Sequence, residues 1–225
     1  MGGPRLAIVI PAHREAGSIG PVVEGAARYG QVIVVDDCSP DDTAANAEAA
    51  GADVIRSPTQ LGYEGALRLG FREADAKGFT HVVTMDADGE HDPTCLESFR
   101  QLLLDEGVPL VLGVRPRKQR IAESILGLYI RARFGARDIL CGMKGYDLAL
   151  YRANGDFSHG DTIGTELAIS AMRARAPFKE VAVDGARRAD EPRFDRLLNA
   201  NLRILGALKR LVIEDLQRKA PATRA

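Results

Sequence analysis

The stretch THVVTMDADGEHDP, residues 80–93, joins an apolar run directly to a group of acidic side chains. Residues 80–85 are rich in apolar and β-branched side chains and predict a buried strand. Asp86, Asp88 and Glu90 follow at alternate positions, so on an extended chain they point to the same side. Carboxylate oxygens suit Mg²⁺ or Mn²⁺, which keep positions open for water or phosphate. We therefore predict a divalent metal site here, in preference to a solvated acidic turn.

The chain around this stretch alternates between strand-like and helix-like segments. Short apolar runs occur at residues 6–10, 31–35, 53–56, 80–85 and 110–114. Such alternation predicts an α/β fold with a mainly parallel sheet flanked by helices. Parallel sheets bind ligands at the carboxyl ends of their strands. The clusters PAHRE (11–15), DDCSPDD (36–42) and DADGEHD (86–92) all follow strands, so we expect them to face one crevice.

The pattern changes after residue 115. A basic run, RPRKQR, precedes a helix-like segment at 120–135, and DILCGMKGYDLALY (138–151) reads as a turn into a strand. We place a domain at residues 1–185 and an amphipathic helical extension at 186–225, where leucines recur at helical spacing. This helix could lie on a membrane surface, pair two subunits in a homodimer or pack on the domain, and packing is our first interpretation.

Composition excludes several classes of protein. The 225 residues carry 30 basic and 31 acidic side chains, a net charge of −1, so no global basic field favours nucleic acid. Three cysteines without a CxxC pair argue against a disulfide framework or structural zinc and favour a reducing compartment. The first apolar run is too short for a signal peptide, and no run is long enough to span a membrane. We expect a cytoplasmic protein, peripheral at the inner face of the membrane if its tail binds there.

Two acidic pairs follow the second predicted strand. Asp36 and Asp37 end that strand, where a carboxylate could accept hydrogen bonds from a nucleobase or a ribose hydroxyl. The alternative is a strand end followed by a capped helix. We assign Asp41 and Asp42 to the helix cap, and Asp36 or Asp37 to a ligand.

Other candidates for anion binding and proton transfer are spread along the chain. Gly62 begins a predicted helix, where backbone N–H groups could meet an anion. Basic side chains that could meet phosphate, or simply form a solvated face, are Arg115, Arg117, Arg131 and Arg133. Glu166, in the first turn of a predicted helix, and Asp138 are candidate general bases for a hydroxyl.

Together these segments resemble the family 2 glycosyltransferases of GT-A fold, especially the dolichyl- and polyprenyl-phosphate sugar synthases. The resemblance covers roughly residues 5–185. It is carried by IVIPAHREAGSI (8–19), VIVVDDCSPDDT (32–43), QLGYEGALRLGF (60–71), VVTMDADGEHDP (82–93), LVLGVRPRK (110–118) and DILCGMKGY (138–146). It implies an inverting transfer of a hexose from a UDP- or GDP-sugar to a polyprenyl phosphate or a saccharide, helped by Mg²⁺ or Mn²⁺.

The resemblance also implies roles for individual residues. Pro11, His13 and Glu15 would line the nucleotide pocket, although PAHRE departs from the family's usual P-x-x-NE. Asp36 or Asp37 would hold the base or ribose, and Gly62 would approach the nucleotide closely.

The acidic and basic groups complete the implied site. Asp86 and the catalytic Asp88 would hold the metal and diphosphate, and Glu90 would be a third ligand where the family often has Gln. An acceptor phosphate would meet Arg115, Arg117 and Arg133. A hydroxyl acceptor would need a base such as Glu166, whereas an ionised phosphate would not.

Two other functions remain open from the sequence. A sugar-1-phosphate nucleotidyltransferase would share the fold class and the acidic ligands. It should carry a Gly-rich basic loop after the first strand, which PAHREAGS lacks. A catalytically silent nucleotide-sugar-binding scaffold would bind the donor without transferring the sugar.

Overall fold

The computed structural model describes residues 3, 5–116, 121–158, 164–183 and 194–219. The strands are β1 (Leu6–Ala12), β2 (Gln31–Asp36), β3 (Asp53–Arg56), β4 (His81–Thr84), β5 (Leu110–Val114), β6 (Lys144–Asp147) and β7 (Phe178–Ala182). The helices are α1 (Ile19–Ala26), α2 (Thr43–Ala49), α3 (Gly62–Ala76), α4 (Cys95–Arg100), the π-helical turn η1 (Gln101–Asp105), α5 (Ile121–Phe134), α6 (Leu148–Asn154), α7 (Glu166–Arg173) and α8 (Phe194–Lys219).

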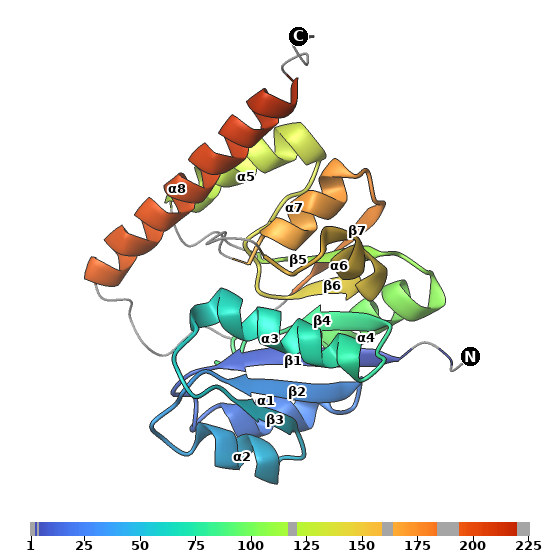
Figure 1. Cartoon of the computed structure of the whole chain (residues 1–225), viewed down its shortest axis with the longest axis vertical. Coiled ribbons are helices and arrows are strands. Elements are labelled where there is room, and N and C mark those ends of the chain that lie inside the picture. Colours follow the sequence, from blue (N-terminus) through green and yellow to red (C-terminus); the bar gives the residue numbers. More distant parts are fainter. Residues whose placement is uncertain (1–2, 4, 117–120, 159–163, 184–193, 220–225) are drawn as a thin grey trace. The chain divides into compact units, whose positions relative to one another are not determined.

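The strands form one seven-stranded sheet in the order β3-β2-β1-β4-β6-β5-β7 (Figure 1). β1 pairs in parallel with β2 and β4, β2 with β3, and β5 with β7. β6 runs antiparallel to both of its neighbours, β4 and β5. The expected mainly parallel sheet is confirmed. Its order reverses between β1 and β4, and such a reversal opens a crevice at the carboxyl ends of the strands.

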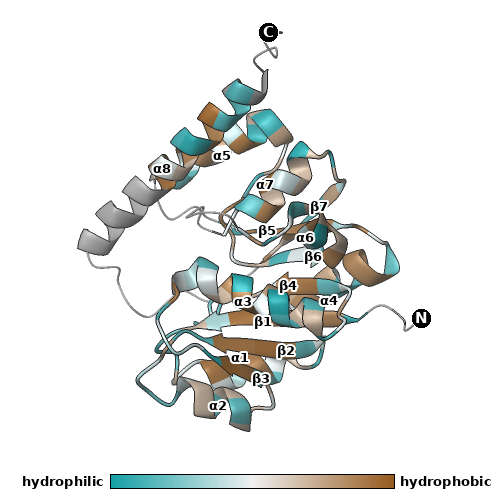
Figure 2. Cartoon of the chain, viewed as in Figure 1, coloured by the Kyte–Doolittle hydropathy of each residue, from teal (hydrophilic) through white to brown (hydrophobic). Residues whose placement is uncertain are grey.

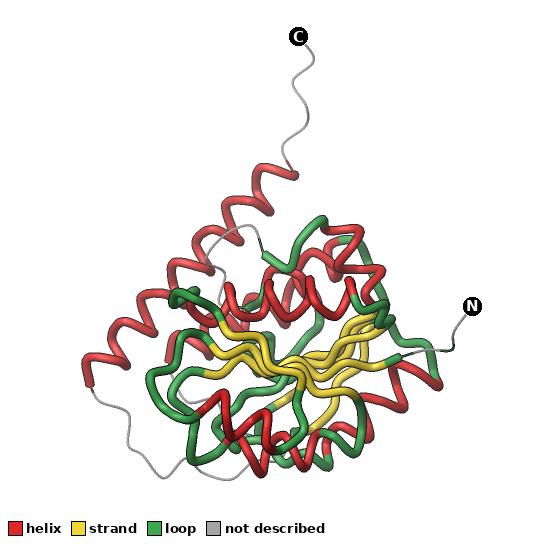
Figure 3. Tube along the Cα trace, turned by 60° about the horizontal axis from the view of Figure 1, so that its bottom comes forward, coloured by secondary structure: helices red, strands yellow, loops and turns green. Residues whose placement is uncertain are grey.

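Helices cover both faces of this sheet (Figure 3). On one face, β-branched side chains of β1 and β2 pack with apolar residues of α1, α2 and α4. On the other face α3 lies so close that a Cβ on Gly70 would meet Val9 Cγ1 at 2.3 Å. Figure 2 shows mainly hydrophobic residues along the strands, whereas the helices carry both hydrophobic and hydrophilic residues.

The segment at 138–151 differs in part from the expectation of a turn into a strand. The strand is short, and α6 begins within the same segment. Asp147 is the reason, because its side chain accepts a 2.7 Å hydrogen bond from the Ala149 N–H and caps the new helix.

The chain divides into two compact units. The first comprises residues 1–116 and 138–189, and the second residues 117–137 and 190–225. This division differs from the predicted boundary at 185, because α5 groups with α8 and not with the sheet. Asp215 of α8 explains the grouping: its buried carboxylate accepts hydrogen bonds from Tyr129 Oη at 2.7 Å and Arg133 Nε at 3.1 Å, both on α5. In the described ranges, every helix is too short or too polar to cross a membrane.

Candidate functional site

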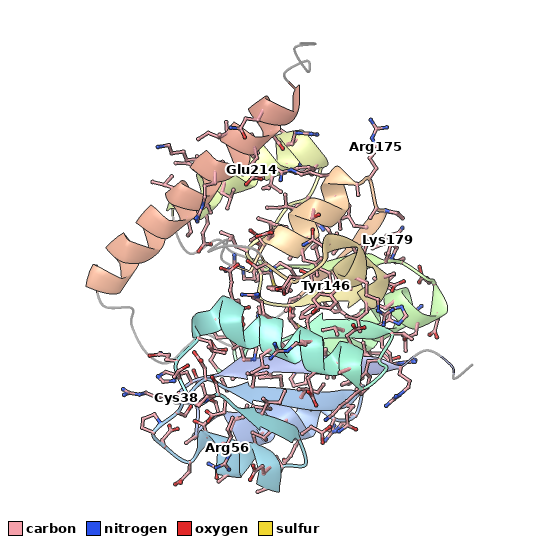
Figure 4. The ribbon with its side chains drawn as sticks, in the orientation of Figure 1. Cys38, Arg56, Tyr146, Arg175, Lys179 and Glu214 are labelled. Atoms are coloured by element: carbon pink, nitrogen blue, oxygen red, sulfur yellow. The ribbon has the colours of Figure 1, made fainter. Side chains whose placement is uncertain are left out.

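A pocket of about 280 Å³ lies where β1, β2 and β4 end and α3 begins. All three strand-end clusters contribute to it, as their position on the sheet led us to expect. Its lining consists of Pro11, Ala12, His13, Glu15, Asp37, Gln60, Gly62, Tyr63, Ala66, Asp86, Ala87 and Asp88. Cys38, labelled in Figure 4, directly follows Asp37 and is exposed.

Asp37 is engaged by the protein itself. Its two carboxylate oxygens accept hydrogen bonds from the backbone N–H groups of Leu61, at 2.5 Å, and Gly62, at 2.8 Å. The anion at the start of α3 is therefore a side chain of this protein. This corrects the expectation that the Gly62 N–H would be open to an external anion. Gly62 has a φ of +75°, a backbone conformation that glycine adopts without strain.

Asp36, unlike Asp37, has a carboxylate oxygen that the protein leaves without a hydrogen bond. Its side chain is only 4% exposed, and its Oδ1 has no hydrogen-bond partner. Buried carboxylate oxygens without a partner are costly and call for an explanation. Asp36 pairs in register with Ala12, which lines the pocket. Asp37 and not Asp36 is among the lining residues, so a role of Asp36 toward a ligand stays a prediction.

The loop after β1 is hydrogen-bonded to the segment after β2. His13 Nδ1 lies 2.8 Å from the Asp37 carbonyl oxygen, and the Glu15 N–H donates to Thr43 Oγ1 at 2.8 Å. Asp41 Oδ1 accepts from the Thr43 N–H at 3.2 Å, as expected of a helix cap, whereas Asp42 makes no capping bond with its side chain. The two loops thus form one wall of the pocket.

Asp86 is held from three sides. Tyr63 donates to its Oδ1 at 3.2 Å, and His91 Nε2 lies 3.4 Å from its Oδ2. Gly142 forms the third side, since a Cβ at that position would lie 2.0 Å from Asp86 Oδ2. Burial raises the pKa of Asp86, but the hydrogen bond and charge of His91 and the charge of Lys144 outweigh it, and the pKa is lowered.

Asp88 follows on the same chain segment and also lines the pocket. Its Oδ1 accepts the Glu90 N–H at 3.0 Å, in a turn made possible by Gly89 at a φ of +73°. Within the residues that the structure describes, no group of three or more acidic, histidine or cysteine side chains is arranged to bind a metal ion. Glu90 as a third ligand therefore stays a prediction, and of the three acids predicted as metal ligands Asp86 and Asp88 line the pocket.

The predicted basic residues lie in different places. Arg115 forms a two-pronged ion pair with Asp138, with Nε–Oδ2 at 2.8 Å and Nη2–Oδ1 at 3.0 Å. Arg133 pairs with Asp215 in the second unit. Arg117 lies outside the described residues.

The two predicted bases are also engaged. Burial raises the pKa of Asp138, but Arg115 more than offsets this, so the pKa falls below its ordinary value and the carboxylate is a weak base. Glu166 Oε2 accepts from the Ser158 hydroxyl at 3.3 Å, and the same hydroxyl lies 3.1 Å from Glu64 Oε1. Neither base is among the residues that line the pocket.

Several residues at the site were given no role from sequence. Gln60 and Tyr63 line the pocket on either side of Gly62. Because Gly62 was predicted to contact the ligand, these neighbours could also have been predicted to lie at the site. His91 belongs to the acidic segment itself. Gly142 lies in the DILCGMKGY stretch that carries the resemblance, but its closeness to Asp86 depends on the pairing of β6 with β4, which that stretch alone does not show.

Comparisons with known proteins agree with this geometry. The model of the family described as "Glycosyl transferase family 2" matches residues 7–179. An undecaprenyl-phosphate mannosyltransferase of Micrococcus luteus is 32% identical over 170 residues, which cover 66% of this chain and 69% of that protein. A polyprenol monophosphomannose synthase of Mycolicibacterium smegmatis is 30% identical over 166 residues. That match covers 63% of this chain and 61% of the relative, so the chain spans less than two thirds of its length.

Solved structures share the fold. Glucosyl-3-phosphoglycerate synthase from Mycobacterium tuberculosis, crystallised with Mn²⁺, UDP-glucose and phosphoglyceric acid, matches with a TM-score of 0.75 at 23% identity. The match covers 92% of this chain and 79% of that one. It bears out the GT-A architecture that the sequence resemblance implied.

Proposed function

Because the chain belongs to glycosyltransferase family 2, we propose that it transfers a hexose from a UDP- or GDP-sugar to a polyprenyl phosphate, with Mg²⁺ or Mn²⁺ at the diphosphate. The observation that carries this proposal is one pocket in which Asp86 and Asp88 face the loops after β1 and β2. The names of the Micrococcus and Mycolicibacterium relatives support this class of acceptor.

The donor nucleotide would lie between those two loops. Asp36 would accept a hydrogen bond from the nucleobase or the ribose, which would satisfy its buried Oδ1. His13, held by the Asp37 carbonyl, and Gln60 would line the same part of the pocket. Asp37 would act indirectly, by holding the start of α3 in place.

The donor atoms of Asp86 and Asp88 fit a divalent cation. Both are carboxylates on one segment, and two protein ligands leave positions for diphosphate oxygens and water. When bound, such a cation stabilises the negative charge of the departing nucleoside diphosphate. The protein's part is to orient the two carboxylates, through Tyr63 and Gly142 for Asp86 and through the Glu90 N–H for Asp88.

The choice of acceptor rests on proton chemistry. In the proposed transfer an acceptor oxygen forms a bond to the anomeric carbon while the bond from that carbon to the diphosphate breaks. A sugar hydroxyl would need a base to take its proton, whereas a phosphate is already ionised near neutral pH. The engagement of Asp138 by Arg115 supports the phosphate. A polyprenyl phosphate lies in a membrane, so we also propose that the enzyme works at a membrane surface.

Transfer of labelled sugar into the lipid phase tests the proposal. Wild type would be incubated with UDP-glucose or GDP-mannose, a detergent-solubilised polyprenyl phosphate, and either MnCl₂ or EDTA. We expect lipid-linked sugar only with metal, none with Asp88→Asn, and unchanged transfer with Glu97→Gln, which alters an exposed acid on α4.

Other outcomes would replace the proposal with specific alternatives. Transfer to a saccharide and not to the lipid would change the acceptor class. Tight nucleotide-sugar binding without transfer to any acceptor would favour a silent binding protein.

A further inference from the structure

Lys144 is a buried lysine on the strand that packs beside the Asp86 segment. It lies on β6 directly opposite Thr84 of β4. Asp86 follows Thr84 by two residues and lies against Gly142, which precedes Lys144 by two residues. Opposed residues of an antiparallel pair point to the same face of the sheet, as do residues two apart on one strand. Lys144, Thr84 and Asp86 therefore share a face, and the missing side chain of Gly142 leaves room for the Asp86 carboxylate beside the strand that carries Lys144.

Lys144 is deeply buried, and its side chain uses only part of its hydrogen-bonding capacity. Its exposed fraction is 3%, and its Nζ donates to the Cys141 carbonyl oxygen at 2.6 Å. An ammonium group has three N–H donors, and this bond uses one of them. A buried charge is costly unless an opposite charge compensates it. Burial lowers the pKa of Lys144, and the neighbouring Cys141, followed by the carboxylates of Asp86 and Asp138, opposes that shift.

Of these two carboxylates, Asp86 is the one left for Lys144. Asp138 is neutralised by the two-pronged ion pair with Arg115, which also donates its backbone N–H to the same carboxylate at 3.2 Å. Asp86 has no arginine or second lysine among its described partners, which are the Tyr63 hydroxyl and the His91 ring. Of the two carboxylates that act on Lys144, Asp86 is thus the one that lines the pocket.

We propose that Lys144 is a built-in cation of the donor site, which shares with the divalent metal the neutralisation of Asp86 and of the nucleotide diphosphate. The inference rests on the proposed function, since it assumes that Asp86 meets a metal and a diphosphate. It makes Lys144 a positioning residue, because it acts through Asp86 and through its field at the pocket.

A charge on Lys144 would act in opposite directions on the binding of metal and of nucleotide. A fixed positive charge repels a metal cation but attracts a diphosphate. Loss of the charge should therefore tighten binding of metal alone and weaken binding of nucleotide alone. The binding of metal would then be increased more strongly by bound nucleotide, and the binding of nucleotide would be increased by bound metal by the same factor. A lysine that merely fills the core would produce neither change.

The test compares wild type with Lys144→Met and Lys144→Gln, two neutral variants of which either suffices if it folds. The matched control is Tyr146→Phe, which removes a buried hydroxyl without a partner from the same strand (Figure 4 labels Tyr146). MnCl₂ alone would be titrated by the loss of the free-ion electron paramagnetic resonance signal. UDP alone and GDP alone would be titrated by calorimetry in EDTA, and thermal melts would confirm folding.

For a folded neutral variant we expect binding of MnCl₂ to be about five- to tenfold tighter and binding of nucleotide about five- to tenfold weaker, with both unchanged in Tyr146→Phe. Unchanged affinities in a folded variant would overturn the proposal. Weaker binding of both ligands together with a lower melting temperature would also overturn it, since that is the pattern of structural support. Wild type that binds neither nucleotide, even with MnCl₂, would instead refute the proposed function.

Discussion

Asp86 owes its position to a residue without a side chain. At Gly142 a Cβ would lie 2.0 Å from Asp86 Oδ2 and 2.5 Å from its Cγ. The obstacle is the end of a side chain, so Gly142→Ala should displace the carboxylate and leave the sheet intact. We expect metal-dependent nucleotide binding to weaken by about tenfold or more, as for a lost charge-assisted contact. Calorimetric titration of nucleotide with MnCl₂ measures this.

A second glycine provides the control for that substitution. Gly20 lies in α1, and a Cβ there would meet no atom within 4 Å. Gly20→Ala should leave nucleotide binding unchanged and stabilise the fold by about 0.4–1 kcal/mol. Equal nucleotide affinity in the two alanine variants would show that Gly142 does not position Asp86.

Neighbouring acids at the end of β2 should behave differently when changed. Asp37→Ala removes the acceptor for two N–H groups at the start of α3 and should destabilise the protein by about 1–2 kcal/mol. Asp36→Asn removes no bond of Oδ1, so stability should be kept while nucleotide affinity falls about tenfold. Urea unfolding and nucleotide titration of both variants separate the two roles. The reverse pattern would assign the nucleotide to Asp37.

At the scale of elements, the Arg115–Asp138 pair joins the end of β5 to the segment that leads into β6. The exposed fractions of the two side chains are 18% and 6%. Removal of one partner should therefore destabilise the protein, because the other charge is left buried without its partner. Asp138→Asn should lower the free energy of unfolding at pH 7 by roughly 2–4 kcal/mol. The exposed pair Arg56–Glu48 is the control, and Glu48→Gln should cost about 0.5 kcal/mol or less.

This pair should also give the protein a pH dependence of known sign. The pKa of Asp138 in the folded state lies below its ordinary value of 3.8. Its contribution is therefore fully present above that value and is lost as the pH falls through the lowered pKa. The stability difference between wild type and Asp138→Asn should shrink only below about pH 4. Urea unfolding from pH 7 to pH 3 measures it, and a difference that already fades at pH 6 would contradict the assignment.

For the whole molecule, occupancy of the site should raise the melting temperature of the unit that holds the sheet. A ligand at about 100 times its Kd adds roughly 2.7 kcal/mol, which is about 5–11 °C for a chain of this size. We expect this shift with UDP or GDP plus MnCl₂, and its loss on addition of EDTA or in Asp88→Ala. A shift of the same size in Asp88→Ala would remove that carboxylate from the site.

The sequence by itself determined the elements and the place of the site. Apolar runs such as 31–35 and 110–114 become strands because their side chains must be buried, and this tendency is local. The acids after β2 and β4 meet at the pocket because parallel strands end at a common edge. No more than the alternation of strands and helices was needed for that result.

Only the tertiary structure decided what each polar group does there. Asp36 and Asp37 are adjacent and identical in type, yet one caps α3 and the other keeps a buried oxygen without a partner. Gly142 lies against Asp86 although the two are more than 50 residues apart in the chain, and the antiparallel pairing of β6 with β4 brings them together. The physical reason is that hydrogen bonds and buried charges depend on which atoms meet in space, and strand register and long-range pairing set those meetings.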